Sequence, residues 1–382
     1  MRICHWLRAA GSLFVALVLP AVLAGCGPGQ VVRVMVVECD GDDEAVALSH
    51  NGENLALLAT NQAGDRSSWL VVTMTPEGRE LWRRQYRQGE VNVAGDVAYD
   101  QAGNVFVTGS SVLEGREMCV AARYRADGAI LWQRALAVGE ASAGRGIALA
   151  EDRVYVGGWT RAEDRQELLL VALNREDGAT LWSRNWRLGG LAAAERLAVD
   201  PRADVERLVV SGITGSAENP DILLAAFDAK GDTSWTRSYD GGGEDRPGGV
   251  AVDRYGHVIA TGTARTPAGP RCVIIERHPD GELIRQTAYG GTTTAEGRGL
   301  ALTPEGGVFV AGTLVAGGER WLLAFEHLPG VTSTWERNWR EGGDVTGAAV
   351  AAAGDVFALG TVAKPGANRN IALVRFSRPQ AE

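Results

Sequence analysis

The sequence predicts an all-β fold, a seven-bladed β-propeller whose blades are four-stranded sheets. Two sequence elements recur at a step of about 50 residues, and no stretch beyond the N-terminal leader shows a sustained helical period. Glycine is abundant, at 50 of 382 residues, whereas proline stands at 13. Glycine excess without proline excess is typical of many tight turns between short strands.

The first repeated element is a turn followed by a strand that carries a large side chain. It reads "DGAILW" at 127–132 and "DGATLW" at 177–182, and related versions end at positions 82, 235, 285 and 335. Successive versions are separated by 50, 50, 53, 50 and 50 residues. A large aromatic at a fixed position of an outer strand can wedge between adjacent blades. We expect this packing from Trp82, Trp132, Trp182, Trp235 and Trp335, and a different one in blade five, which has Arg285 there.

The second repeated element is a β-branched run that ends in glycine. It keeps the same step, with its glycines at Gly109, Gly158, Gly212, Gly262, Gly312 and Gly360, and a version near Thr60 lacks the glycine. Each unit is predicted to contain four strands. In blade two we expect them at 97–99, 105–108, 118–125 and 130–136.

The ring is predicted to close through the N-terminal strand. The first three strands of a unit appear seven times, the last set at 348–376, whereas the fourth appears six times. The segment "VVRVMVV" at 31–37 precedes the first complete unit and has the pattern of a strand. Pairing of this segment with the last three strands would remove the open edge. We therefore predict one propeller domain over 31–382.

The first thirty residues have the features of a targeting segment. Arg2 and Arg8 flank a positively charged start, and an apolar run follows from Gly11 to Gly25. The run is too short for a stable membrane span, so residues 1–25 are predicted to be a signal peptide. Its end, Leu23-Ala24-Gly25-Cys26, resembles the lipobox of bacterial lipoproteins. The alternative is an ordinary signal peptide with an incidental cysteine.

The lipobox resemblance implies that Cys26 becomes the acylated N-terminus, followed by a short tether in 26–30. Several acyl chains anchor a protein far more firmly than one. Position 27 is glycine. By analogy with Gram-negative lipoproteins, the absence of aspartate there favours the outer membrane. The short tether predicts a folded body close to the bilayer surface.

The repeats resemble known propeller families. The segments Gly95–Ser111 and Gly243–Ala264 resemble the bacterial β-propeller repeat of envelope and secreted proteins. Ala172–Trp182, "ALNREDGATLW", resembles the tryptophan motif of pyrroloquinoline-quinone-type propellers. That group includes the lipoprotein of the outer-membrane β-barrel assembly machinery, whose eight blades and shorter repeat argue against close kinship. The resemblance implies the fold and leaves the activity open.

Sequence motifs for chemistry are few. Quinoprotein dehydrogenases of the wider group use an adjacent cysteine pair, whereas the cysteines of the mature chain are Cys26, Cys39, Cys119 and Cys272. Cys119 and Cys272 hold the same third-strand position in blades two and five, which favours buried free thiols over a disulfide. The histidines lack metal-ligand spacing, and "DGDDE" at 40–44 lacks the turn glycine of an EF-hand and reads as a solvated connection. We predict no cofactor, no metal and no catalytic constellation.

Charged residues recur just before or within each first strand. The first strands of a propeller line its axis, so these residues should gather around one mouth of the channel. We consider two interpretations: a ring of acid–arginine pairs that links neighbouring blades, and a mouth that recognises a partner or polar ligand. The candidate binding residues are Asp96, Arg145, Glu195, Arg196, Asp245, Arg246, Glu296 and Arg298, with Asp43, Glu44 and Asp344 at related positions.

The function is predicted only in outline. We expect an outer-membrane-anchored lipoprotein of the cell envelope that acts as a scaffold or binding module with a protein partner. The alternatives are an envelope enzyme, a lyase or glycan-active hydrolase with its site at the axial mouth, and a mainly structural surface protein. A net charge of −9 argues against nucleic acid as a partner, because phosphate binding needs a basic face.

Overall fold

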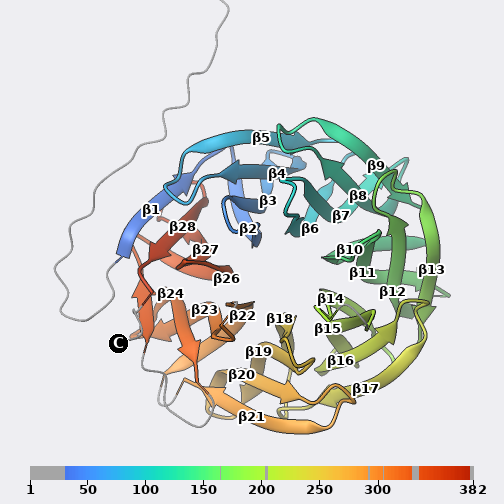
Figure 1. The fold of residues 1–382 in the computed structure, drawn as a ribbon. Helices are drawn as coiled ribbons and strands as arrows, with labels where there is room; N and C mark the ends of the chain where they lie inside the picture. Colours follow the sequence, from blue (N-terminus) through green and yellow to red (C-terminus); the bar gives the residue numbers. More distant parts are fainter. Residues whose placement is uncertain are drawn as a thin grey trace, which may run out of the picture.

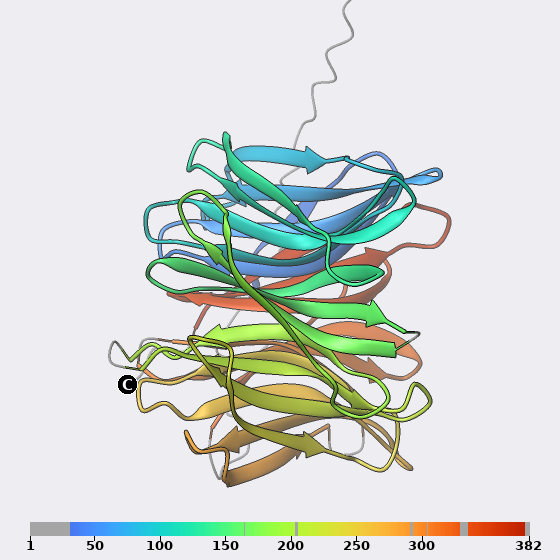
Figure 2. The ribbon, with the colours of Figure 1, turned by 90° about the vertical axis from the view of Figure 1, so that its right-hand side faces the viewer.

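The computed structural model describes residues 31–163, 165–202, 205–290, 293–303, 305–328 and 335–378. These residues form a ring of seven antiparallel sheets around a central axis (Figures 1 and 2), which confirms the predicted seven-bladed propeller. The predicted signal peptide 1–25 and the tether with Cys26 at 26–30 lie outside the described residues. Among the described residues, no helix has the length and apolar character needed to cross a bilayer.

Blades 1 to 6 each contain four consecutive strands, ordered from the axis to the rim. Blades 1 to 3 consist of β2 (Asp42–His50), β3 (Leu55–Ala63), β4 (Arg66–Met74) and β5 (Glu80–Tyr86); β6 (Asn92–Tyr99), β7 (Val105–Leu113), β8 (Arg116–Tyr124) and β9 (Ile130–Leu136); β10 (Ala141–Leu149), β11 (Arg153–Ala162), β12 (Arg165–Asn174) and β13 (Thr180–Trp186). Blades 4 to 6 consist of β14 (Ala193–Val199), β15 (Arg207–Gly215), β16 (Pro220–Asp228) and β17 (Thr233–Tyr239); β18 (Arg246–Val252), β19 (Val258–Thr266), β20 (Gly269–Arg277) and β21 (Leu283–Tyr289); β22 (Thr294–Leu302), β23 (Val308–Ala316), β24 (Glu319–His327) and β25 (Glu336–Trp339).

Blade 7 is closed by the N-terminal strand, as predicted. It contains β26 (Asp344–Ala353), β27 (Asp355–Ala363), β28 (Asn370–Phe376) and β1 (Val31–Val37), which pairs antiparallel with β28. The register runs from Val31 opposite Phe376 to Val37 opposite Ile371. In Figure 1, β1 lies on the rim beside β28, so the two ends of the described chain meet in one sheet.

The strands of blade 2 were located correctly, but three of them differ in their bounds: β8 starts two residues earlier and ends one residue earlier than predicted, and β6 and β7 are longer. The outer strand, 130–136, has its predicted bounds, whereas β6 starts five residues earlier and β7 continues five residues further, to Leu113. The extensions carry polar residues, such as Asn92 and Ser111, which are buried and bonded to each other (2.8 Å). Hydrophobic patterning does not predict the ends of strands whose residues are polar and hydrogen-bonded to one another.

The core is divided among the junctions between neighbouring blades. In β7, Val105 and Val107 pack with residues of blade 1, whereas Phe106 packs with residues of blade 3. This alternation follows from the strand period of two, which sends successive side chains to opposite faces of a sheet. Each blade is therefore apolar on both faces, and each face is covered by a neighbour.

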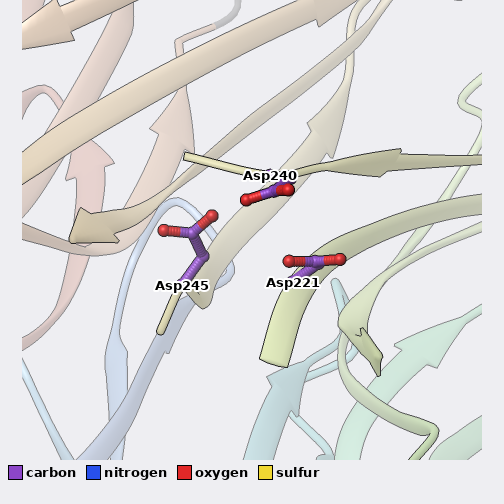
Figure 3. Close-up of side chains that lie close together, drawn as sticks. All are labelled: Asp221, Asp240 and Asp245. Atoms are coloured by element: carbon purple, nitrogen blue, oxygen red, sulfur yellow. The ribbon is translucent and has the colours of Figure 1, made fainter. Parts of the chain in front are cut away.

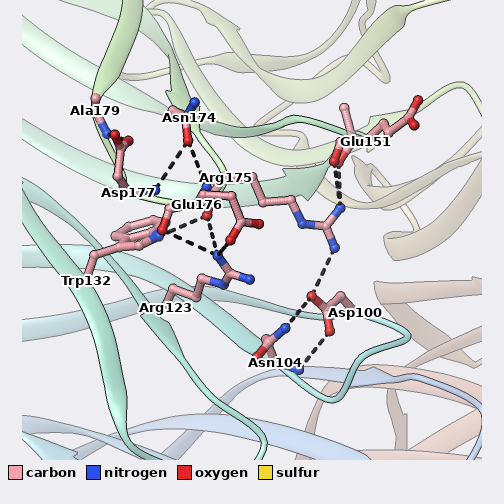
Figure 4. A network of polar contacts seen from close by, with 11 residues as sticks. Asp100, Asn104, Arg123, Trp132, Glu151, Asn174, Arg175, Glu176, Asp177 and Ala179 are labelled. Carbon is pink, nitrogen blue, oxygen red and sulfur yellow. Dashed lines mark hydrogen bonds and ion pairs between the residues drawn. The ribbon is translucent and has the colours of Figure 1, made fainter.

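The repeated tryptophans join each blade to the next. The Trp132 side chain is 4% exposed, and its indole N–H donates to the carbonyl of Arg175 (3.0 Å), in the turn that precedes the outer strand of blade 3 (Figure 4). Gly178 of the same turn has φ of +71°, and a Cβ placed there would lie 2.7 Å from the indole ring. The tryptophan of one blade therefore packs on the repeated "DG" turn of the next blade. The other indoles donate in the same way, Trp82 to Ala126, Trp182 to Ala229, Trp235 to Pro279 and Trp335 to Ser377.

The junction of blades 5 and 6 is packed differently, as predicted from Arg285. The Arg285 guanidinium lies 3.1 Å from the Glu276 carboxylate, which also contacts the imidazole of His327 in blade 6 (2.9 Å). Burial pushes the pKa of Glu276 upward, but the hydrogen bond with His327 and the charge of Arg285 hold it below its ordinary value. A polar network therefore takes the place of the indole at position 285, while Tyr289 of blade 5 stacks on Phe325 of blade 6 (4.1 Å between ring centroids).

Candidate functional site

The axis of the ring is lined by the first strand of each blade (Figure 1). The ladder between the first and second strands shifts register at the same place in every blade. Such a β-bulge leaves a residue unpaired and turns its side chain. The residues within these seven shifts are Val46, Gly95, Arg145, Glu195, Gly248 with Gly249, Arg298 and Ala348.

Two cavities follow the axis, one on each side of the bulges. The larger has a volume of about 560 Å³ and is lined by residues at the start of the first strands, including Glu44, Arg145, Glu195 and Arg369. The smaller, about 230 Å³, is lined by the later halves of the same strands and contains Asp96. Arg196, Arg298 and Ala348 line both cavities, so these residues lie where the cavities meet.

Arg196 holds strands from different blades together. One of its terminal nitrogens donates to the carbonyls of Glu195 (2.8 Å) and Arg145 (3.2 Å), and the other donates to the carbonyl of Val46 (3.4 Å). Val46 belongs to blade 1 and Arg196 to blade 4, so this side chain reaches across the axis. Its contacts are with backbone oxygens rather than carboxylates.

The two acids of the axis lie in a poorly solvated environment. Burial raises the pKa of Glu195, against the opposing charges of Arg145 and Arg196. Burial also raises the pKa of Asp96, against the charge of Arg196 and two backbone hydrogen bonds, from Val97 (2.9 Å) and Ile147 (3.2 Å).

The remaining candidates are placed away from the axis. Arg246 and Glu296 line a third cavity of about 210 Å³ between blades 5 and 6, which also includes Arg298. Asp245 lines none of the three cavities: it is fully buried and accepts hydrogen bonds from the backbone N–H groups of Gly241 and Arg265. The structure thus brings five candidates to the axis, Asp96, Arg145, Glu195, Arg196 and Arg298, and places the other three elsewhere.

The acid–arginine pairs near the mouth are mostly formed within one blade. Arg298 bonds Glu296 in the same strand (3.1 Å), and Arg246 pairs with Glu244. At the junction of blades 7 and 1, Arg369 lies 3.9 Å from the Glu44 carboxylate. Among the described residues, these contacts do not extend into a ring of pairs from blade to blade.

An acidic cluster lies where β16 of blade 4 meets the connection between blades 4 and 5. The carboxylate oxygens of Asp221, Asp240 and Asp245 lie within 4.8 Å of one another (Figure 3). Burial raises the pKa of Asp221, and the charges of Asp240 and Asp245 raise it further. Oxygen ligands of this kind suit a hard cation. The Asp245 carboxylate already accepts hydrogen bonds from two backbone N–H groups. The cluster therefore has a structural role, in which a buried carboxylate holds the turn.

Other predicted features have structural roles. Asp43 of the "DGDDE" segment is buried, and its carboxylate accepts hydrogen bonds from the Cys39 N–H and the Asn61 amide (both 3.0 Å), so the segment is more than a solvated connection. Cys119 and Cys272 are fully buried free thiols, as expected, and burial raises the pKa of each to about 12. Each sulfur packs against a glycine in the first strand of the next blade, Gly144 or Gly297.

Fold and sequence together define the class of protein, a propeller of pyrroloquinoline-quinone-type repeats. The chain belongs to the family whose description is outer membrane protein assembly factor BamB, and the family model matches residues 116–372. The repeat of this chain is longer than that of the lipoprotein of the β-barrel assembly machinery, which argued against close kinship. The family model nevertheless matches the chain. No curated protein matches the sequence.

Solved structures share the fold at low sequence identity. Kuenenia stuttgartiensis hydrazine synthase superposes with a TM-score of 0.60 at 13% identity, over 89% of this chain and 97% of the solved chain. Chaetomium thermophilum Raptor gives 0.58 at 10% identity, over 89% of this chain but 29% of its own. A family PL25 ulvan lyase gives 0.56 at 8% identity, over 88% and 95%. At these identities the likeness is one of fold.

Sequence reasoning missed the bulges, although they leave a trace in the repeat. The unpaired residues recur at 46, 95, 145, 195, 248, 298 and 348, which is the same step as the tryptophans. Aligning the units on that step would have separated Arg145, Glu195 and Arg298 from the other charges. Arg369 carries no repeat signal, because it lies in a loop of blade 7 before β28.

Proposed function

We propose that this protein is an outer-membrane-anchored lipoprotein that acts as a scaffold or binding module in the cell envelope. The observation that carries the proposal is membership of the family described as outer membrane protein assembly factor BamB. The Leu23-Ala24-Gly25-Cys26 segment adds the chemistry of an anchor, because a lipidated Cys26 would hold the protein at a membrane.

The closing strand supports a close approach to the bilayer. β1 begins at Val31, so four residues, 27–30, separate it from Cys26. Four residues span at most about 14 Å. A lipid on Cys26 would therefore keep the rim of blade 7 near the headgroups. The opposite rim and the axial mouth would remain available to partners.

The outer strands of blades 1 to 3 support a protein partner. Leu81, Leu131 and Leu181 occupy the position before the wedge tryptophan and are 38%, 45% and 48% exposed. They lie on β5, β9 and β13, which are edge strands of three successive sheets. Apolar side chains beside unpaired backbone groups are suited to an added strand from another protein. We propose that an extended segment of an envelope protein binds this rim.

The anchor is tested by metabolic labelling with palmitate in a Gram-negative host. The wild-type chain should incorporate label and fractionate with outer membranes on a density gradient. Cys26→Ser should lose the label and appear in the soluble periplasmic fraction. Cys39→Ser is the control and should behave as wild type. Equal membrane association of wild type and Cys26→Ser would contradict the proposed anchor.

The binding rim is tested with a photo-crosslinking amino acid in place of Leu131 in the full-length lipoprotein in cells. Ser234 is the matched control, because it is exposed at the equivalent position of blade 4 and is polar. We expect protein adducts from position 131 and fewer from position 234. Adducts of equal strength at both positions, or none at position 131, would refute a partner on this rim.

No observation on the described residues favours the alternative enzymatic function. His257 bonds Asp253 (3.1 Å) and His327 bonds Glu276 (2.9 Å), and neither imidazole lines an axial cavity. The likeness to an ulvan lyase is one of fold, at 8% identity. The scaffold or binding function is therefore the one that we propose.

A further inference from the structure

We propose that the larger axial cavity binds a small anion that carries two or more carboxylate or phosphate groups, held by Arg145 and Arg298. This site is separate from the proposed anchor and from the apolar rim. It would give the propeller a small-molecule ligand in addition to a protein partner.

The positions of the two arginines suit such a ligand. Arg145 and Arg298 occupy the bulges of blades 3 and 6, whose inner strands β10 and β22 lie on opposite sides of the axis (Figure 1). Blade 4 has the acidic Glu195 at its bulge, and the bulge residues of the remaining blades are uncharged, Val46, Gly95, Gly248 and Ala348. Arg145 and Arg298 both line the cavity, and a guanidinium group can bind a carboxylate or phosphate through paired donors.

The charge of the cavity is opposite to that of the whole chain. The net charge of the chain is −9, yet the cavity is lined by Arg145, Arg196, Arg298 and Arg369 against Glu44 and Glu195. The Glu44 carboxylate is 62% exposed at the rim and lies nearest Arg369. Arg298 is paired with Glu296, which does not line this cavity, and Glu195 lies near Arg145 and Arg196, so the arginines that line the cavity outnumber its two acids. A concave site lined by excess positive charge attracts anions.

The Arg145 side chain has hydrogen-bond donors without acceptors. In the part of the chain that the structure describes, its side chain makes no hydrogen bond or ion pair, and its buried Nε lacks an acceptor. The Nε of Arg298 is likewise buried without an acceptor, although a terminal nitrogen bonds Glu296 (3.1 Å). The terminal nitrogens of Arg145 have no hydrogen-bond partner among the described residues, so they are the donors that a bound anion would engage.

The size of the cavity selects a small molecule. A volume of about 560 Å³ falls within the range of small-ligand sites, about 300–1,000 Å³. Arg196 has a different role, because its donors already hold backbone oxygens of three blades.

The test is isothermal titration calorimetry on the full-length lipoprotein in detergent micelles at constant ionic strength, with citrate and pyrophosphate as probes. We expect one of them to bind at a single site. Arg145→Gln and Arg298→Gln should each weaken that binding about ten-fold or more, because each removes a charge-assisted contact. Citrate alone would indicate a carboxylate ligand, and pyrophosphate alone a phosphate ligand.

Two further variants separate the site from general effects. Arg125→Gln, on an exposed turn paired with Asp127, is the control and should leave the affinity unchanged. Ala348→Phe fills the cavity from the bulge of blade 7 while all arginines remain, and it should also weaken binding. Each variant is checked for unchanged thermal unfolding. The proposal is overturned if neither probe binds, or if Arg145→Gln, Arg298→Gln and Ala348→Phe bind as wild type does.

Discussion

Replacing Trp132 with alanine removes the wedge between blades 2 and 3. The side chain is 4% exposed, packs near the Phe106 ring (6.2 Å between centroids) and donates its indole N–H to the Arg175 carbonyl. Trp→Ala at a buried site costs about 3–5 kcal/mol. Trp132→Phe keeps a ring but loses the hydrogen bond, worth about 1 kcal/mol. We expect the midpoint of urea unfolding, followed by circular dichroism, to fall in the order wild type, phenylalanine, alanine.

A double-mutant cycle with Gly178 tests whether the indole is packed on the turn. In the wild type, Gly178→Ala meets the ring at 2.7 Å and places a side chain at φ of +71°. Without the ring, only the backbone strain remains, about 1–2 kcal/mol. Gly178→Ala should therefore cost at least about 1 kcal/mol less in the Trp132→Ala background. Additive effects would refute the wedge, as would a loss below about 1 kcal/mol for Trp132→Ala alone.

Three further perturbations test closure, thiol burial and acid repulsion. Val37→Lys, at a β1 position 6% exposed, should lower the free energy of unfolding by about 2–4 kcal/mol, whereas Val36→Lys at 42% exposed should change it little; similar urea midpoints would contradict closure by β1. Cys119 and Cys272, with pKa values raised to about 12, should react with iodoacetamide at pH 8 only after unfolding, and mass spectrometry of the native protein would reveal any earlier reaction. Asp221 binds its proton more tightly in the folded state, so its contribution to stability is present at low pH and is lost as the pH rises through its folded pKa. Asp221→Asn should therefore raise the melting temperature at pH 7, and should raise it less near pH 4. A melting temperature equal to that of wild type at pH 7 would exclude the repulsion.

The repeat determines much of the architecture in advance. The tryptophan step located the contacts between blades, and the count of fourth strands located the closing partner at 31–37, because both depend on apolar residues at fixed spacing. Arg285 marked the one complete unit without the aromatic, and the structure there has the pair with Glu276. Packing of this kind follows from local sequence, because each sheet has to cover its neighbour.

The candidate site was predicted less well, because it depends on side-chain direction. Asp245 and Arg246 are adjacent in sequence, but one is buried in a turn and the other lines a cavity between blades. A charge near the start of a first strand can face the axis, a turn or a neighbour. The bulge decides among these outcomes for Arg145 and Arg298, and a shift of one residue in a ladder leaves little trace in a single unit.

Closure through β1 and β28 also constrains how the molecule is made. The two strands lie at opposite ends of the described sequence, so the sheet that completes the circle can form only after the whole intervening chain has been synthesised. Until then the flanks of blades 1 and 7 lack their cover, and the chain keeps an unfinished surface that chaperones can recognise. The seam between β1 and β28 is therefore the last part of the ring that can form.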